Sequence, residues 1–238
     1  MTSSERQKTI AILQSNYIPW KGYFDIIRRA DLFIVLDEVQ STKNDWRNRN
    51  QVKTAGGVTW LSVPVHHSTA SRICDVQIAD HHWSKKHYRT IAQAYAKAPF
   101  FSANEPWLHK AYEHAGVLSL LSDVNKHFIH AICGNLGITT EIANASSFLP
   151  SADLDALSPT ERLVKLCQKV GGTRYLTGPA ARTYLNLAAF EQADIAVEWM
   201  TYDHYPPYTQ LHGDFRHQVS ILDLILMTGP EALRYIDP

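Results

Sequence analysis

The sequence contains few cysteines, no long apolar run and no excess of charge of either sign. Its three cysteines, Cys74, Cys133 and Cys167, are far apart and form no Cys-x-x-Cys pair. This pattern argues against a disulfide framework or a zinc knuckle and is typical of a reducing compartment. No stretch approaches the ~18 to 20 uninterrupted apolar residues that a membrane-spanning helix needs. The start, MTSSERQKTIAIL, has no long apolar run between a basic segment and a small-residue cleavage site, so we expect no secretory signal and a disordered lead at residues 1–8. We therefore expect a cytoplasmic protein with no membrane span.

The charges of the chain balance, because 23 Lys and Arg residues are matched by 23 Asp and Glu residues. Proteins that bind nucleic acids usually carry a basic excess, since neutralising phosphates supplies most of their affinity. A nucleic-acid partner is therefore disfavoured. The twelve histidines are scattered, and the best-spaced set of metal ligands, His127 with His130 and Cys133, lies on an apolar helical pattern. We therefore expect no bound metal.

Apolar runs and helical periodicities alternate along the chain in an order typical of an α/β fold. Residues 9–14 and 32–36 are apolar runs that flank a helical pattern at 22–30, which predicts a βαβ unit with two buried parallel strands. A third strand is expected at 58–65, after a loop at 45–53. Further elements are expected as strands at 174–177 and 196–202 and as helices at 158–170, 188–194 and 219–227.

A helical insertion is expected at about residues 83–136, where apolar residues recur at three- and four-residue steps. Pro99 and Pro106 are expected to break this insertion into at least two helices. A later helix begins with a capping-box pattern at Ser158. The order of elements predicts an α/β fold with a mostly parallel, Rossmann-like sheet that carries the insertion, in one domain spanning residues 9–238.

The segment between the first strand and the first helix, QSNYIPWKGYF at residues 14–24, is the strongest candidate for a ligand site. It follows the carboxyl end of a parallel strand, where α/β proteins bind ligands. Gly22 would let an anionic group approach the backbone at the start of the helix. Alternatively, the aromatic residues simply pack the loop, which is our interpretation of Phe24. The expected ligand contacts are Asn16, Tyr17, Trp20, Gly22 and Tyr23.

The spacing Pro-x-x-Gly-Tyr in this segment is similar to the signature of nucleotidylyl transferases. In that signature a His-x-Gly-His run cradles the phosphates of a nucleotide. Trp20 and Tyr23 stand where the two histidines would be, so the imidazoles that would stabilise a transferring phosphoryl group are missing. The resemblance implies a remotely similar fold and gives little support to adenylyl transfer.

Residues 46–53, WRNRNQVK, combine cations, amides and an indole in a short segment. Guanidinium groups match phosphate or carboxylate geometry in a bidentate way. We expect an anion site here rather than an ordinary solvated loop. Its expected members are Arg47, Asn48, Arg49, Asn50 and Lys53.

Three further titratable residues are candidates on position alone. Asp37 follows the second buried strand, so its carboxylate is either a general base or the partner of an arginine. His66 follows the expected third strand and is a candidate base. Asp223 is polar within an apolar run at 221–227, so it either faces the site or belongs to a buried ion pair.

On these segments and several others, the chain resembles the WbqC-like protein family along nearly its whole length. The shared segments are LQSNYIPWKGYFDIIRRADLFIVLDEVQ (13–40), WRNRNQVK (46–53), TWLSVPV (59–65), HWSKKH (82–87), YLTGPAARTYL (175–185), PPYTQL (206–211) and VSILDLILMTGPEA (219–232). The resemblance implies a link to bacterial O-antigen and related surface-glycan gene clusters. It also implies transfer of glycine, or a similar aminoacyl group, to the amine of an amino sugar. It carries no settled catalytic residues.

Aminoacyl transfer to an amine needs a base, donors for an oxyanion and contacts for the substrate's anionic groups. Asp37 or His66 would be the base, and Gln14 and Asn48 would be the donors. Arg47, Arg49 and Lys53 would form a cationic clamp for the pyrophosphate of a nucleotide-linked amino sugar, with no cofactor beyond a magnesium ion that accompanies such a ligand.

The expected partners are therefore this small-molecule substrate and a carrier of the aminoacyl or acyl group. Two alternatives stay open at this point. One is a nucleotide-dependent, nucleotidylyl-transferase-like enzyme, and the other is a non-catalytic protein that binds a sugar nucleotide.

Overall fold

The computed structural model describes residues 7–66 and 71–237, which form two compact units. The sheet unit contains residues 7–14, 26–39 and 139–203, and the helical unit contains residues 15–25, 40–66, 71–138 and 204–237. Residues 1–6 of the expected lead lie outside the described part of the chain, as does His67 beside His66. The expectation of one domain over residues 9–238 stays a prediction.

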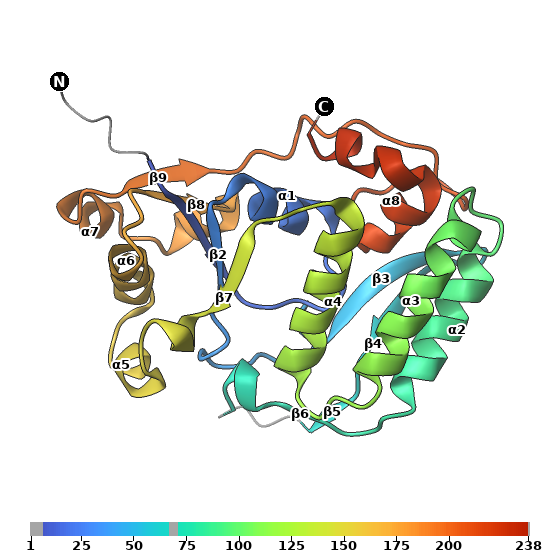
Figure 1. Ribbon diagram of the computed structural model, residues 1–238, viewed down its shortest axis with the longest axis horizontal. Helices are drawn as coiled ribbons and strands as arrows, with labels where there is room; N and C mark the ends of the chain where they lie inside the picture. Colours follow the sequence, from blue (N-terminus) through green and yellow to red (C-terminus); the bar gives the residue numbers. More distant parts are fainter. Residues whose placement is uncertain (1–6, 67–70, 238) are drawn as a thin grey trace. The chain divides into compact units, whose positions relative to one another are not determined.

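The sheet unit is built on five strands that all run parallel (Figure 1). In spatial order they are β7 (Glu141–Asn144), β2 (Leu32–Val35), β1 (Thr9–Leu13), β8 (Arg174–Thr177) and β9 (Ala196–Trp199). The helix α1 (Lys21–Arg29) connects β1 to β2, whose register runs from Ile10 opposite Leu32 to Leu13 opposite Val35. The predicted βαβ unit and the parallel α/β fold are confirmed.

Apolar strands explain why this sheet is covered on both faces. Alternate residues of β1 and β2, such as Ile10, Ile12 and Ile34, pack in one apolar core. That core is closed by the helices α5 (Ser151–Asp155), α6 (Pro159–Lys169) and α7 (Leu187–Gln192). Figure 1 shows these helices along one face and α1 along the other. Side chains of the other parity, such as Phe33, are also fully buried, as expected of a parallel sheet with two covered faces.

The capping box at the start of α6 is confirmed. The backbone N–H of Glu161 donates to Ser158 Oγ at 3.4 Å, and the backbone N–H of Ser158 donates to Glu161 Oε2 at 2.8 Å. Each bond satisfies a donor that the first turn of a helix leaves without an intrahelical partner. The sequence therefore places the beginning of this helix correctly.

The edge strand β7 is not predicted by the sequence pattern. It reads EIAN, with Ile142 as its single large apolar side chain and with both end residues exposed. Because it pairs with β2 alone, it is held mainly by backbone hydrogen bonds and needs little apolar surface. Such a strand leaves almost no signal in hydrophobic periodicity.

The helical unit contains the predicted insertion, which forms three helices. They are α2 (Trp83–Tyr95), α3 (Phe101–Ala115) and α4 (Leu121–Leu136), and a further helix, α8 (Ile221–Thr228), comes from the end of the chain. Pro99 separates α2 from α3 as expected, but Pro106 lies inside α3, so the break expected there is wrong. Near the beginning of a helix a proline removes only one backbone hydrogen bond, which the rest of a long helix tolerates.

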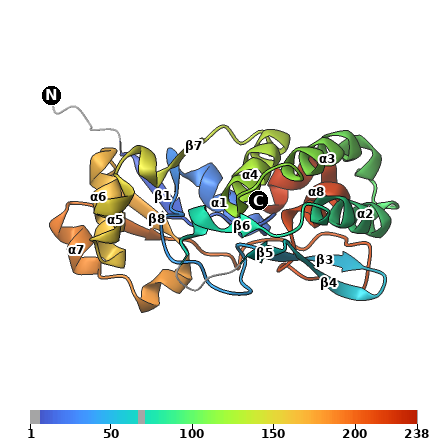
Figure 2. The ribbon, with the colours of Figure 1, turned by 90° about the horizontal axis from the view of Figure 1, so that it is seen from below.

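Two small antiparallel sheets in the helical unit correct the sequence analysis. β3 (Arg49–Thr54) occupies much of the loop expected at 45–53, and it pairs with β4 (Gly57–Ser62). The expected third strand at 58–65 is therefore half of a hairpin and not a strand of the parallel sheet. Figure 2 shows β3 and β4 side by side. The side chains of β3 alternate in burial over most of its length, but their polarity hides this period of two.

The remaining elements are short. β5 (Val65–His66) pairs antiparallel with β6 (Gln77–Ile78). His66 was a candidate base because it was expected to follow a strand of the parallel sheet. It lies instead in β5, which is not part of that sheet. Short 3₁₀ helices occur at Ile73–Asp75, Ala145–Ser147, Pro179–Thr183 and Gly229–Tyr235. None of the helices within residues 7–66 and 71–237 is long and apolar enough to cross a membrane.

Candidate ligand-binding site

A strained loop precedes α1 in the helical unit. Ile18 has a φ of 36° although it is β-branched and fully buried, a conformation that costs roughly 1–3 kcal/mol and persists only where the surroundings impose it. The side-chain amide of Asn50 imposes it here, because its Nδ2 donates to the carbonyl oxygens of Tyr17 and Ile18 at 3.1 and 2.9 Å. The Oδ1 of Asn50 accepts from the backbone N–H of Gln51 at 2.7 Å. Asn50 therefore acts as a positioning residue for the loop.

Further hydrogen bonds hold the same loop at both ends. The N–H of Tyr17 donates to the carbonyl oxygen of Trp46 at 2.9 Å, and the N–H of Ile221 donates to that of Pro19 at 2.9 Å. Buried Asn125 donates from Nδ2 to Ser15 Oγ at 3.1 Å. The loop is thus fixed by β3, α4 and α8, which makes it a rigid support for side chains that contact a ligand.

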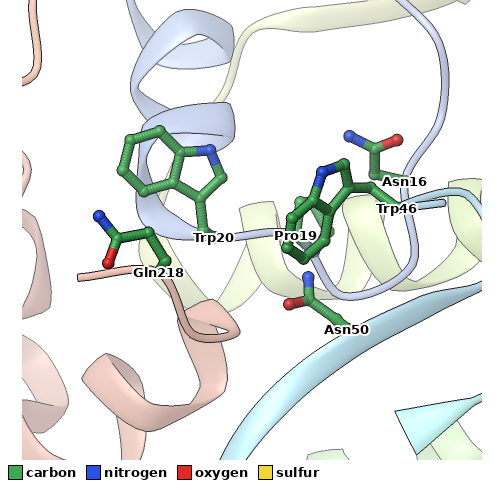
Figure 3. A pocket seen from close by; sticks show the side chains of 6 residues that line it. All are labelled: Asn16, Pro19, Trp20, Trp46, Asn50 and Gln218. Carbon is green, nitrogen blue, oxygen red and sulfur yellow. The ribbon is translucent and has the colours of Figure 1, made fainter. Parts of the chain in front are cut away.

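The loop opens onto a pocket of about 190 Å³, which we call the amide pocket. It is lined by Asn16, Pro19, Trp20, Trp46, Asn50 and Gln218, with no charged side chain among them (Figure 3). Figure 3 shows Gln218 on the side of Trp20 and Asn16 on the side of Trp46. Within the described ranges, the side chains of Asn16 and Gln218 have no hydrogen-bond partner. Both amides are therefore available to a ligand.

Two exposed indoles continue from this pocket along the hairpin. Trp46 and Trp60 are 45% and 42% exposed, and their ring centroids lie 5.5 Å apart at an angle of 38°. The Arg49 Cζ lies 4.4 Å from the centroid of the Trp60 ring, within the range of a cation–π contact. We call these three residues the indole strip. Because Trp46 also lines the amide pocket, the two features form one continuous surface.

The three cations of the expected clamp lie in different environments. Arg47 pairs with Asp45, with Nη1 at 3.1 Å from Oδ2. The buried Lys53 ammonium donates to Gln210 Oε1 at 2.9 Å and to the carbonyl oxygen of Asp214 at 2.7 Å, so a ligand anion would have to displace these acceptors. Arg49 has neither an ion pair nor a hydrogen bond from its side chain in the part of the chain that the structure describes.

Asp223 lies in a buried hydrogen-bond network instead of on a surface. Its fully buried carboxylate accepts from Tyr95 Oη and Tyr208 Oη, both at 2.8 Å, and from Gln210 Nε2 at 2.9 Å. Desolvation raises the pKa of Asp223, although these hydrogen bonds and the nearby Lys53 oppose the increase. The network joins α2, the segment before α8 and α8 itself, which is a structural role.

The aromatic residues of the loop divide between packing and the pocket. Tyr17 is fully buried, and its Oη lies 2.8 Å from His87 Nδ1 and 2.9 Å from Tyr112 Oη. Tyr23 is buried against Phe24, so the packing interpretation describes these residues well. Trp20 is partly exposed and lines the amide pocket.

Gly22 supports the packing of Trp20. A Cβ at position 22 would lie 2.3 Å from the Trp20 ring. This distance is far below van der Waals contact, so the indole can occupy its place only beside a glycine. The space over this glycine, which was expected to admit an anionic group, is filled by the indole.

The expected catalytic residues lie in both units. Gln14 and Asp37 follow β1 and β2 at the same edge of the sheet, where the N–H of Leu36 donates to the carbonyl oxygen of Leu13 at 2.9 Å. Asp37 is buried. In the helical unit, His66 is exposed, and Asn48 donates from Nδ2 to the carbonyl oxygen of Val63 at 3.1 Å.

Sequence reasoning missed part of the site. Pro19 and Trp46 lie in the two segments that the sequence analysis identified, but neither was named as a ligand contact. Trp46 could have been named, because its indole lies close to Arg47 and Arg49 in the chain. Gln218 gives no local signal. His217, its neighbour, has a pKa lowered by burial and by the positive charge of Lys21, so its imidazole is mainly neutral at pH 7.

Buried Lys21 was also missed. Its Nζ donates to the carbonyl oxygen of Tyr235 at 3.0 Å and lies 4.7 Å from the centre of the Tyr205 ring. Burial lowers the pKa of this ammonium to about 8. Lys21 directly follows Trp20, which lines the amide pocket. The contacts of Lys21 therefore hold the backbone beside this wall of the pocket.

Comparison with known proteins gives a family and no activity. The profile of the WbqC-like protein family matches residues 14–235. The chain is similar to the uncharacterized protein Rv1507c of Mycobacterium tuberculosis (strain ATCC 25618 / H37Rv), with 43% identity over 233 residues that cover 96% of this chain and 97% of the relative. No solved structure matches the chain significantly.

Proposed function

We propose that this chain, which belongs to the WbqC-like protein family, binds an amino sugar in the amide pocket and transfers an aminoacyl (glycyl) or other acyl group to its amine. The observation that carries the proposal is the composition of the pocket: two indoles, and beside them two amides without a partner among the described residues, with no charged side chain in the lining. Aromatic walls cover the apolar face of a sugar ring, and primary amides both donate to and accept from its hydroxyl groups.

The size of the pocket supports a single ring. Its volume of about 190 Å³ equals that of roughly six water molecules at about 30 Å³ each. This is small for a drug-sized ligand, since such pockets start at about 300 Å³. A monosaccharide is a ligand of the right scale, and the rest of a larger substrate would lie outside.

The absence of charge in the pocket lining also suits the chemistry. An amine attacks an acyl group only when it is unprotonated, and a carboxylate beside it would favour the ammonium form. A neutral, partly apolar pocket favours the free amine. This environment supports transfer to nitrogen more than it supports binding of a permanently charged ligand.

In the proposed step the amine nitrogen forms an amide bond to the acyl carbon, the bond between that carbon and its carrier breaks, and a general base passes the amine proton to the departing carrier group. Oxyanion donors stabilise the tetrahedral intermediate. His66 and neutral His217, which is next to Gln218 in the chain, are the candidate bases within the helical unit. Asn48 is the proposed oxyanion donor within the helical unit. One N–H of the Asn48 amide is engaged by Val63, which leaves the second one for the substrate. The proposed setting is cytoplasmic surface-glycan biosynthesis with a nucleotide-linked acceptor and an acyl carrier.

The direct test is a transfer assay read by mass spectrometry. The purified protein is incubated with free and nucleotide-linked amino sugars and with activated acyl donors, including glycyl donors. We expect an acylated amino sugar whose formation falls at least tenfold in the Asn16→Ala/Gln218→Ala variant. Product formation that is unchanged in this variant would contradict the proposal, and sugar binding without product would favour a non-catalytic binding protein.

The strand order favours one second candidate. The spatial order β7-β2-β1-β8-β9 places the five strands in the chain order 3-2-1-4-5, as in mononucleotide-binding α/β folds. A nucleotidylyl transfer would release pyrophosphate from a nucleoside triphosphate. Adding a nucleoside triphosphate to the same assay in place of the acyl donor separates the two functions, because acyl transfer to an amine releases no pyrophosphate.

A further inference from the structure

We propose that the indole strip binds a nucleoside diphosphate, with a base against the exposed indole of Trp60 and the phosphates at Arg49. This inference rests on the proposed function of the amide pocket, which would hold the sugar of the same nucleotide-linked molecule. It assigns the nucleotide to Arg49 and Trp60 and removes it from Arg47 and Lys53, whose charged groups already have partners.

The first argument is the location of the available charge. The amide pocket has no charged lining residue, so phosphates attached to a bound sugar must find a cation outside it. Arg49 is the cation of residues 46–53 whose side chain has no hydrogen bond or ion pair with any residue in the described ranges. Guanidinium groups bind phosphate oxygens through several charged hydrogen bonds.

The second argument is the exposure of the two indoles. Trp46 and Trp60 are the tryptophans among the exposed large apolar residues, whereas Trp83 in the same unit is 2% exposed. An exposed indole leaves a large apolar surface in water, which is unfavourable unless a ligand covers it. Proteins that bind a nucleobase with little preference for its identity usually stack it on an aromatic side chain.

The third argument is that the strip is held in place before a ligand arrives. Trp60 lies opposite Gln51 in the register of the hairpin, and the Arg49 guanidinium lies over its ring. The carbonyl of Trp46 is held by the N–H of Tyr17 at 2.9 Å. A surface that is already ordered loses little conformational entropy on binding, so it suits a ligand group that must be recognised outside a closed pocket.

The experiment is isothermal titration of the full-length protein with three separate probes: uridine diphosphate, adenosine diphosphate and free glucosamine. Trp60→Ala is expected to weaken binding of both nucleotides by about tenfold to a hundredfold, the scale of one stacking contact. Arg49→Ala should weaken the binding of both nucleotides by about tenfold and reduce the dependence of this binding on salt. Glucosamine binding should stay within about twofold in both variants.

Matched variants in the sheet unit serve as controls. Arg182 lies over the Trp199 ring at 4.8 Å, so Arg182→Ala removes a comparable arginine–indole contact. Tyr184 is 60% exposed, so Tyr184→Ala removes an exposed aromatic ring. Both controls should leave nucleotide binding unchanged. Because Trp60 is exposed, Trp60→Ala should keep the far-ultraviolet circular dichroism of the parent, and Trp60→Phe should restore part of the affinity.

The outcomes separate the two proposals. Nucleotides that fail to bind, or that bind Trp60→Ala as tightly as the parent, would overturn the inference about the strip, while glucosamine binding would leave the proposed function standing. Nucleotide binding that depends on Trp60 would support the strip. Glucosamine binding that depends on Trp60 as strongly as nucleotide binding does would assign the strip to the sugar and overturn the inference.

Discussion

The sheet unit and the helical unit differ in what they bury. In the sheet unit the core between the sheet and the helices is apolar, as at Ile10, Ile34 and Leu166. The buried carboxylates of Asp37 and Glu38 follow β2 outside this core. The helical unit buries lysine, aspartate, asparagine and histidine side chains together with its apolar residues. Parallel strands satisfy their polar groups in the backbone, whereas the loop and hairpin around the candidate site use side chains for this purpose. The comparison teaches that the candidate pocket lies where the fold depends on polar contacts.

The largest expected effect comes from breaking the buried polar network of the helical unit. Asp223→Ala would leave the hydroxyl groups of Tyr95 and Tyr208 without their shared acceptor and would remove the negative charge near the Lys53 ammonium. We expect a loss of about 3–5 kcal/mol in the free energy of unfolding, because buried donors lose their acceptor and the buried Lys53 ammonium loses a nearby opposite charge. Urea unfolding of the parent protein and of Asp223→Ala measures this loss in the free energy of unfolding.

A double-mutant cycle with Lys53→Met sharpens this test. Because Lys53 and Asp223 interact, the double variant should lose less stability than the sum of the two single losses, by about 0.5–3 kcal/mol. Additive losses would show that the two residues are energetically independent. That result would contradict the claim that the helical unit is stabilised by a coupled network of buried polar side chains.

The second effect is sensitivity to acid, which should be confined to the helical unit. No histidine occurs among the described residues of the sheet unit. Burial lowers the pKa of His87 from 6.5 to about 4. In the unfolded chain His87 therefore binds a proton below about pH 6.5, whereas in the folded chain it binds one only below about pH 4. This contribution to stability is present above pH 6.5 and is lost as the pH falls toward 4, by roughly 3 kcal/mol.

Hydrogen exchange as a function of pH measures this difference by region. Corrected for the intrinsic exchange rate, protection of α2 should fall between pH 6.5 and 4, and His87→Gln should reduce the fall. His82→Gln is the matched control, because the side chain of His82 is 83% exposed. Equal losses of protection in β1 and β2 over the same range would contradict the confinement to one unit.

The third effect concerns the strained loop. Asn50→Ala removes the two hydrogen bonds that hold the carbonyls of Tyr17 and Ile18. We expect a loss of about 1–3 kcal/mol in stability, since buried acceptors lose their donor, together with weaker sugar binding. Asn48→Ala is the matched control for an amide with one backbone acceptor. Crystallography of Asn50→Ala should show Ile18 relaxed to negative φ, and an unchanged loop would refute the positioning role.

The smallest expected effect belongs to the sheet unit. Ser158→Ala removes the side-chain cap of α6 and should cost about 1 kcal/mol. The loss should leave ligand binding unchanged, because the contacts of the amide pocket come from other residues. Thermal unfolding with and without glucosamine measures both quantities. A change in sugar affinity in this variant would show that the site depends on the sheet unit's local stability.

The two units also differ in how far the sequence predicts them. Continuous apolar runs identify β1 and β2, and the caps identify α6, because each signal is local. The edge strand β7 and the hairpin strand β3 were missed. In β3, polar side chains such as Asn50 and Lys53 occupy buried positions, and β7 has a single large apolar side chain, so neither strand shows the apolar period of two.

The candidate site shows the same limit. Asn16, Trp20 and Asn50 were predicted from their position after a strand and in the polar segment, and they line the pocket. Gln218 joins them from the other end of the chain, and local patterns carry no information about such contacts. The roles of Lys53 and Asp223 depend on partners at 208–214 that only the fold brings together.

The most direct test of the account is titration of glucosamine into the parent protein and into Asn16→Ala/Gln218→Ala. These two amides line the amide pocket and have no partner among the residues described. The account predicts saturable binding to the parent and at least a tenfold loss in the double variant, with melting temperature unchanged. Absence of binding to the parent, or equal affinity in the double variant, would contradict the claim that the amide pocket is a sugar site.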